Sequence, residues 1–277
     1  MEAVIHKALN YWFTAKPVCL NWWYNQIGIP KTLGTVFILF EKQLTPVEKQ
    51  NAITVMENAK FGMTGQNKVW LAGNVMMRAL LQNDYELVKM ARDTIASEIV
   101  TGGAEGIKDD WCFHQHGAQQ QFGNYGLSFV SGMSFFSGLF SGTSLAFDDK
   151  QLNILSTLID KGYRWVIWKG MMDVNALGRQ LFHHAPVHKA LSLAFAASEL
   201  GGGESDECVA VATALLHDNY PAPAVNVLTG HKHFWQSDYT IHRRPSWMAS
   251  IKMASDRIIG TEMMNGDNMK GYYMADK

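Results

Sequence analysis

The densest group of chemically useful side chains lies between residues 109 and 126. This segment contains Cys112, His114 and His116 among several glutamines, and it ends in a glycine-rich run that carries Tyr125. Long polar side chains between glycines are poor material for a plain core, and loops that hold such residues over a rigid scaffold often carry function. We therefore expect a site here, with His116 and Tyr125 converging on one bond if a turn or helix start lies between them.

A tyrosine beside a histidine suits the removal of a proton next to a carboxylate. The resulting carbanion is unstable, so catalysis needs a donor that neutralises the carboxylate and a base above the carbon. An asparagine amide or a histidine can be that donor. A tyrosine whose pKa is lowered by a nearby arginine can take the proton and return it to the leaving oxygen. The bland alternative is that both residues are structural, as is usual in a helical domain.

Cys112, His114 and His116 also allow a metal site. Each is two residues from the next, so an extended segment would direct all three side chains to one side. Neighbouring aspartates or the pair His183–His184 could complete a zinc site. Against this, His-x-His arises often by chance, and the sequence has no His-Glu-x-x-His motif. A metal-dependent hydrolase that uses these three residues is the alternative from composition.

Apolar residues at helical spacing predict the elements that position these side chains. We expect helices over residues 2–14, 31–41, 46–60, 66–82, 84–99, 119–145, 150–168, 187–200 and 205–217. Thr45 followed by Pro46 is typical of an N-cap with proline at the first helical position. Successive antiparallel pairs with short connections favour an α/α solenoid or toroid.

The hydrophobic pattern of the sequence changes from helical spacing to alternation after Pro221 and Pro223. Residues 231–242 alternate and are rich in aromatic side chains, as a strand would be, and residues 246–254 and 256–262 are similar. The sequence therefore predicts a helical domain over residues 1–225 and the beginning of a β domain over residues 226–277.

Composition excludes several classes of function. The 277 residues include 24 basic and 25 acidic ones, for a net charge of −1, which is not the broad basic field of a nucleic-acid binder. The three cysteines are widely spaced and odd in number, so we expect no disulfide framework. No apolar run reaches the length of a membrane span, and residues 1–6 do not begin a signal peptide. Binding of a polyanion would need local positive charge.

Two adjacent tryptophans, Trp22 and Trp23, stand in an Asn-Trp-Trp segment before Pro30. Both cannot face one core stripe of a helix, so we expect one of them to be exposed near a groove. Packing between neighbouring helices is the alternative.

Several motifs in order resemble those of the polysaccharide lyases of the hyaluronate, chondroitin AC and xanthan lyase group. The match runs over nearly the whole chain and is carried by Asn21–Pro30, Thr64–Asn67, His116 with Tyr125 in the same nine-residue spacing, Gly178–Arg179, and Glu262–Asn268. The resemblance implies an incomplete α/α toroid followed by an antiparallel β-sandwich domain, with the first strands of that domain in this chain. Most of the family's β region is absent here.

The resemblance also implies a role for each matching residue. Asn67 and His116 neutralise the uronate carboxylate, Tyr125 acts as base and then acid, Arg179 lowers the pKa of Tyr125, and Glu262 supports Arg179 or Asn67. The expected substrate-binding residues are Trp22, Trp23, Asn265, His183 and Arg243. His183 replaces a second arginine that the family often has, and Asp267 replaces a glutamate.

The implied reaction is a β-elimination on an acidic, uronate-containing polysaccharide such as chondroitin or hyaluronan, leaving a 4,5-unsaturated uronate. It requires no metal and no other cofactor. We expect a monomer with no nucleic-acid or membrane partner, located outside the cell or in the periplasm. A glycan-binding or inactive fragment is a second alternative, and a glycosidase is less favoured because no carboxylate pair faces the aromatic segment.

Overall fold

The computed structural model describes residues 2–200 and 228–260. These residues belong to two compact units, which divide between Glu98 and Ile99. Each unit has its own architecture, and the first is entirely helical while the second combines helices with short strands.

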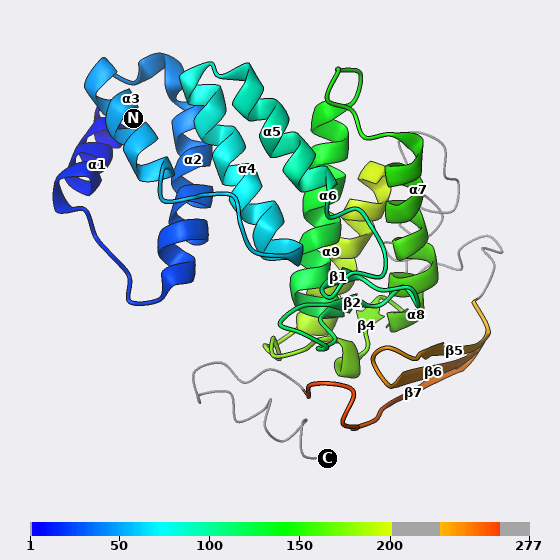
Figure 1. Ribbon diagram of the computed structural model, residues 1–277. Coiled ribbons are helices and arrows are strands. Elements are labelled where there is room, and N and C mark those ends of the chain that lie inside the picture. The colour runs from blue at the N-terminus through cyan, green and yellow to red at the C-terminus, as the bar shows by residue number, and fades with distance from the viewer. Residues whose placement is uncertain (1, 201–227, 261–277) are drawn as a thin grey trace. The chain divides into compact units, whose positions relative to one another are not determined.

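The first unit is a set of packed helices (Figure 1). Its elements are α1 (Glu2–Ala15), η1 (Tyr24–Gly28), α2 (Ile29–Leu39), η2 (Glu41–Gln43), α3 (Pro46–Met56), α4 (Gly65–Gln82) and α5 (Tyr85–Ala96). Helix α4 packs against α2, α3 and α5. The core that joins the first four α-helices contains Leu9, Phe13, Phe37, Ala52, Met56 and Leu81. The expected helices are all present, although α3 stops at Met56 rather than near residue 60 because the chain turns there.

Helix α3 begins with the cap that the sequence predicts. The Thr45 hydroxyl accepts a hydrogen bond from the backbone nitrogen of Glu48, and the Glu48 carboxylate accepts one from the backbone nitrogen of Thr45. This reciprocal arrangement satisfies two amides that a helix start would otherwise leave without partners.

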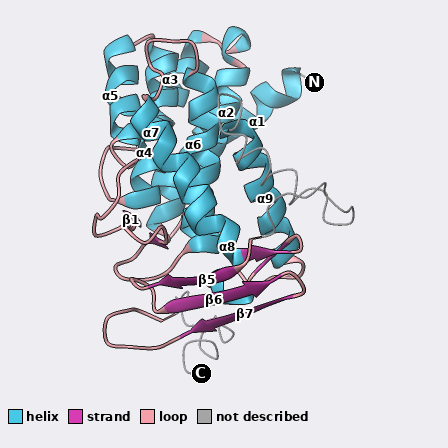
Figure 2. Cartoon of the chain, turned by 90° about the vertical axis from the view of Figure 1, so that its right-hand side faces the viewer, coloured by secondary structure: helices cyan, strands magenta, loops and turns pink. Residues whose placement is uncertain are grey.

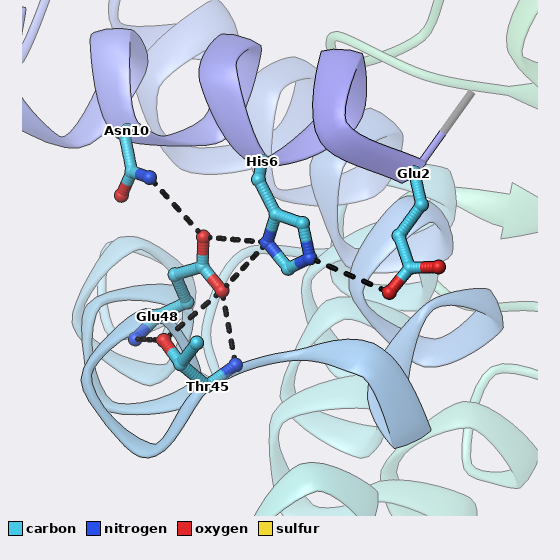
Figure 3. A network of polar contacts seen from close by, with 5 residues as sticks. All are labelled: Glu2, His6, Asn10, Thr45 and Glu48. Carbon is cyan, nitrogen blue, oxygen red and sulfur yellow. Dashed lines mark hydrogen bonds and ion pairs between the residues drawn. The ribbon is translucent and has the colours of Figure 1, made fainter.

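The same carboxylate also holds α1 (Figure 3). It accepts hydrogen bonds from His6 Nδ1 at 2.8 Å and from Asn10 Nδ2 at 3.3 Å, and its side chain is only 4% exposed. Burial alone would raise the pKa of Glu48, but the hydrogen bonds from Thr45 and His6 outweigh it and hold the pKa below its usual value. The network therefore ties α1 to the start of α3.

The second unit surrounds the polar segment identified in the sequence. Its elements before residue 201 are β1 (Gly106–Ile107), β2 (Phe113–His114), η3 (Phe122–Gly126), α6 (Leu127–Phe140), α7 (Asp149–Thr157), η4 (Leu158–Tyr163), α8 (Arg164–Val166), β3 (Ile167–Trp168), β4 (Met171–Met172), η5 (Val174–Ala176) and α9 (Ala185–Leu200). Helices α6 and α9 pack together, and the Ser134 hydroxyl donates to the Ala196 carbonyl between them. Pairing of β1 with β2 and of β3 with β4 is antiparallel.

A three-stranded antiparallel sheet follows, with β6 in the middle (Figure 2). Its strands are β5 (Gly230–Phe234), β6 (Tyr239–Arg244) and β7 (Trp247–Lys252). The ring of Phe234 lies 5.1 Å from that of Phe122, and the Tyr239 hydroxyl donates to Asp173 at 2.5 Å. Apolar packing and buried hydrogen bonds thus join this sheet to the helical part of the second unit.

Some expected boundaries are wrong. Residues 231–242 form two strands with a turn between them, where Ser237 is buried against the helical part and Asp238 has a left-handed backbone. Residues 119–121 and 167–168 are not helical, and residues 256–260 contain no strand, only an isolated bridge at Ile259. The expected helix over 205–217 and the domain boundary at 225 lie outside the described residues, so both stay predictions. No helix in the described ranges is long and apolar enough to span a membrane.

Candidate active site

Tyr125 lies in the π-helical turn η3, immediately before α6. It is 6% exposed. Glycines let this turn pack closely, because a Cβ on Gly123 would come within 2.8 Å of the Ala176 carbonyl oxygen and one on Gly126 within 2.5 Å of the Tyr163 hydroxyl. The run of glycines in the sequence is therefore a packing requirement that lets the turn carrying Tyr125 lie against the segment around residue 176.

His116 contacts Tyr125 from a left-handed turn. Its φ angle is +62°, and its ring meets the Tyr125 ring edge-to-face with centroids 4.8 Å apart. Left-handed backbone costs a non-glycine residue about 1 kcal/mol, so something must hold it. The Glu105 carboxylate does so, since it accepts hydrogen bonds from the Gly117 backbone nitrogen at 2.8 Å and from the side-chain amide of Gln115.

Arg179 approaches the same tyrosine from a third segment. It follows Gly178, which also has a left-handed backbone with φ of +65°. Arg179 Nη2 donates to the Tyr125 hydroxyl at 3.4 Å, and its Cζ lies 5.4 Å from the centre of the Tyr125 ring. A guanidinium in this position favours the phenolate, because opposite charge stabilises the ionised form. The second unit thus brings His116, Tyr125 and Arg179 together, as the sequence predicts.

Two further charged residues support these elements, and the sequence analysis named neither. Glu105 holds the His116 turn, and the buried amine of Lys189 donates to the Gly123 carbonyl and to Gln180 Oε1. Burial lowers the pKa of Lys189 to about 8. A signal for Lys189 was present, since it stands on the same helical face as Ala185 and Leu193, which are buried.

The alternative metal site at Cys112, His114 and His116 is not formed. Within the described ranges no three such side chains cluster as metal ligands. The Ser237 hydroxyl donates to Cys112 Sγ at 3.1 Å and lies 2.9 Å from His114 Nε2, while His116 packs on Tyr125. The left-handed turn at His116 ends the extended segment, so its side chain leaves the side that the other two share.

In the first unit, Asn67 occupies the first turn of α4. Asn67 is buried, and its side-chain Oδ1 has no hydrogen-bond partner within the part of the chain that the structure describes. The turn is held by Glu98, whose carboxylate accepts from the Gly65 backbone nitrogen at 2.8 Å and pairs with Lys68 at 2.9 Å. The unpartnered oxygen is an acceptor, whereas a carboxylate would need the amide nitrogen as donor, so the role of Asn67 toward the carboxylate stays a prediction.

The two tryptophans differ as expected. Trp22 is 44% exposed, whereas the ring of Trp23 meets Tyr24 and Trp70 edge-to-face with centroids 5.4 and 5.5 Å apart. Lys31 Nζ lies 5.5 Å from the centre of the Trp70 ring. The first unit therefore carries an aromatic group with a cation beside it, and Trp22 offers a free face for stacking.

The remaining expected binding residues have different surroundings. His183 is exposed, and its ring centre is 3.7 Å from that of His184. Arg243 is buried, and its guanidinium donates to the Arg164 carbonyl at 2.6 Å. Burial and the neighbouring Arg164 lower the pKa of Arg243 to about 10. Glu262 and Asn265 lie outside the described residues, so their roles stay predictions, as do those of His183 and Arg243.

Comparison with family models identifies the class of protein. Residues 1–198 match the model of the polysaccharide lyase family 8, N terminal alpha-helical domain, and residues 229–276 match the model of the polysaccharide lyase family 8, super-sandwich domain. The chain belongs to polysaccharide lyase family 8. This confirms the expected fold class, mainly α and toroidal, with the first strands of an antiparallel β-sandwich at its end.

Individual relatives agree with this assignment. The chain is 29% identical to chondroitinase-AC of Pedobacter heparinus over 98% of its own length and 40% of the relative. It is 25% identical to xanthan lyase of Bacillus sp. over 95% of its length and 32% of the relative. A structure of chondroitinase AC lyase with oligosaccharides superposes with a TM-score of 0.85 at 27% identity, over 99% of this chain and 42% of that one. The chain thus spans about two fifths or less of the relatives that it matches here.

Proposed function

We propose that the chain is the helical catalytic part, with the start of the β region, of a lyase that cleaves a uronate-containing acidic polysaccharide by β-elimination. The observation that carries this proposal is that both His116 and Arg179 contact Tyr125, in a chain of polysaccharide lyase family 8. The relatives named chondroitinase-AC, hyaluronate lyase and xanthan lyase support the substrate class.

In the proposed reaction, Tyr125 as phenolate removes the proton from C5 of the uronate. The electron pair forms the C4–C5 double bond, the bond from C4 to the bridging oxygen breaks, and Tyr125 returns its proton to that oxygen. Tyr125 takes one proton and gives the same proton back, so the reaction consumes no water and regenerates the phenolate. Arg179 favours the phenolate at the start of this cycle through its position beside the hydroxyl.

Charge that develops on the uronate carboxylate needs a donor. His116 is the donor that the site provides. Its ring lies against Tyr125, and its backbone turn is held by the hydrogen bond from the Gly117 nitrogen to the Glu105 carboxylate. Asn67 is the second donor that the family resemblance implies. Its amide nitrogen would donate to the carboxylate from a helix start that Glu98 holds in place. A preorganised donor of this kind lowers the activation free energy by about 3 kcal/mol.

Trp22 and Trp23 are proposed to stack on neighbouring sugar rings, and Trp22 is the more suited of the two because it is 44% exposed. His183 is proposed to contact the polymer beside Arg179, where its exposed ring is accessible. Arg243 is less suited to substrate binding than the sequence suggested, because it is buried. Glu262 and Asn265 are proposed to complete the site. Secretion outside the cell or into the periplasm, and action as a monomer, are part of the same proposal.

The test is ultraviolet absorbance during incubation with hyaluronan, chondroitin sulfates and xanthan-type polymer, each with and without a chelator. A rise from the conjugated double bond that resists the chelator is expected and would identify the substrate. Reducing ends without absorbance, lost on chelation, would replace the proposal with a metal-dependent hydrolase. Binding without cleavage by a chain that includes the complete β region would leave a glycan-binding protein.

A further inference from the structure

Lys189 carries a buried amine that the proposed reaction does not use. The residue lies on α9 and is 5% exposed. Its ammonium donates to the backbone carbonyl of Gly123 and, at 2.6 Å, to Oε1 of Gln180. Both acceptors are neutral, and no carboxylate of the described chain forms an ion pair with this amine.

The two acceptors lie beside the two residues of the Tyr125–Arg179 pair. Gly123 belongs to η3, the same five-residue π-helical turn as Tyr125, and Gln180 follows Arg179 in the chain. Tyr125 and Arg179 are 54 residues apart in sequence and come from separate segments. A single ammonium on a third element therefore joins the segment that carries the phenol to the segment that carries the guanidinium.

The buried position of Lys189 disfavours a charged side chain. Burial disfavours the ammonium and lowers the pKa of Lys189 to about 8. Methionine has a similar shape and would fill the same space on this face of α9 without desolvating a charge. Packing alone therefore does not account for a lysine here, whereas the two hydrogen bonds require one.

We propose that Lys189 is a positioning residue for the Tyr125–Arg179 pair and acts through Gly123 and Gln180 without touching the substrate. Arg179 Nη2 lies 3.4 Å from the Tyr125 hydroxyl, at the long end for a hydrogen bond, so a small shift of either segment breaks the contact. A misplacement of about 1 Å at a catalytic group can lower the rate on the order of 100-fold. The kinetic part of this inference rests on the proposed function, and the structural part does not.

The test compares Lys189→Met with Lys232→Met in the intact protein. Lys232 is a suitable control because it is half-buried in the same unit, its Nζ lies 5.0 Å from the centre of the Phe234 ring, and its loss removes the same charge. Lys189→Met is expected to lower kcat about 100-fold. KM should change by less than about threefold, because Lys189 makes no contact with the substrate and the groups that bind it are unchanged. Lys232→Met is expected to retain kcat.

Hydrogen exchange measured by mass spectrometry supplies a readout that does not depend on activity. Exchange at residues 122–126 and 178–182 should be faster in Lys189→Met than in the wild type, and unchanged in Lys232→Met. If the wild type cleaves no polymer, the proposed function fails while the exchange result still decides the structural link. Unchanged exchange in both segments would overturn the inference.

Gln180→Leu keeps the test decisive if Lys189→Met does not fold. It removes one acceptor and should lower kcat about tenfold, and its effect should not add to that of Lys189→Met in the double variant, because both break one link. A folded Lys189→Met or Gln180→Leu protein with kcat within about threefold of the wild type would show that Lys189 only packs α9.

Discussion

Two polar networks, one in each unit, show how differently a charged group can be used. In the first unit the Glu48 carboxylate is surrounded by His6, Asn10 and Thr45 at short distances (Figure 3). In the second unit the Tyr125 ring packs against His116 with centroids 4.8 Å apart, and its hydroxyl accepts a 3.4 Å hydrogen bond from Arg179. Both oxygens of Glu48 are held by short hydrogen bonds, whereas the proposed reaction requires the Tyr125 hydroxyl to exchange a proton.

The difference teaches where rigidity is placed. Around Glu48 the tight contacts involve the charged group itself, so the network stabilises the junction of α1 and α3 and leaves nothing for chemistry. Around Tyr125 the tight contacts lie one step away, at Glu105 and Lys189, which hold the backbone that carries the reactive side chains. A functional group is thus held through its supports and kept available at its tip.

The largest effect should come from Tyr125→Phe. This change removes the proposed base and acid, so kcat should fall by about 10³- to 10⁴-fold. The free energy of unfolding should change little, because the ring that packs on His116 is kept and the hydrogen bond from Arg179 is long, at 3.4 Å. Initial rates by ultraviolet absorbance and thermal unfolding measure both quantities. Tyr239→Phe is the matched control, since its hydroxyl is buried on Asp173, and it should lose stability but keep turnover. Retained turnover in Tyr125→Phe would refute the assigned base.

A second and smaller effect is expected for Glu105→Gln. The amide replaces one acceptor oxygen with a donor that faces either the Gly117 nitrogen or the Gln115 amide, so the left-handed turn at His116 loosens. We expect kcat to fall about tenfold, close to the cost of one charge-assisted hydrogen bond. Steady-state kinetics measure this, with Glu86→Gln on the exposed face of α5 as a control. An unchanged kcat would mean that the Glu105 hydrogen bonds are not needed to hold the His116 turn.

The sequence predicts the helices well, because they depend on local patterns. The family motifs predict that His116, Tyr125 and Arg179 act together, and the structure places the three in contact, while their catalytic roles stay predictions. The cap at Thr45 and the helix α4 follow from residue type and period. The helical period indicates that Lys189 faces the core. The partners of Glu105 and Lys189 could not be predicted, since they depend on which backbone carbonyl or amide lies opposite across the fold. The hairpin in residues 231–242 was missed because alternation continues through its turn, where Ser237 and Asp238 are buried by contacts with distant residues.

Trp22→Ala tests the proposed stacking surface of the first unit. Trp22 is 44% exposed, so its loss should cost little stability, and the lost stacking of about 1 kcal/mol would raise KM roughly fivefold with kcat unchanged. Substrate titration of initial rates measures the change. Trp247→Ala offers a control of nearly equal exposure, at 46%, on β7. Equal KM values for both variants and the wild type would remove Trp22 from the substrate path.

The smallest effect on turnover should come from Glu48→Gln, which completes the comparison from the structural side. Because the pKa of folded Glu48 lies below its usual value of 4.5, its stabilisation is complete above that pH and is lost as pH falls through the folded pKa. Chemical denaturation should show about 1–3 kcal/mol of lost stability at neutral pH and a shallower decline with acid than in the wild type. Glu41→Gln removes a half-exposed pair with Lys49 and should lose far less. A fall in kcat at full folding would break the distinction between the two networks.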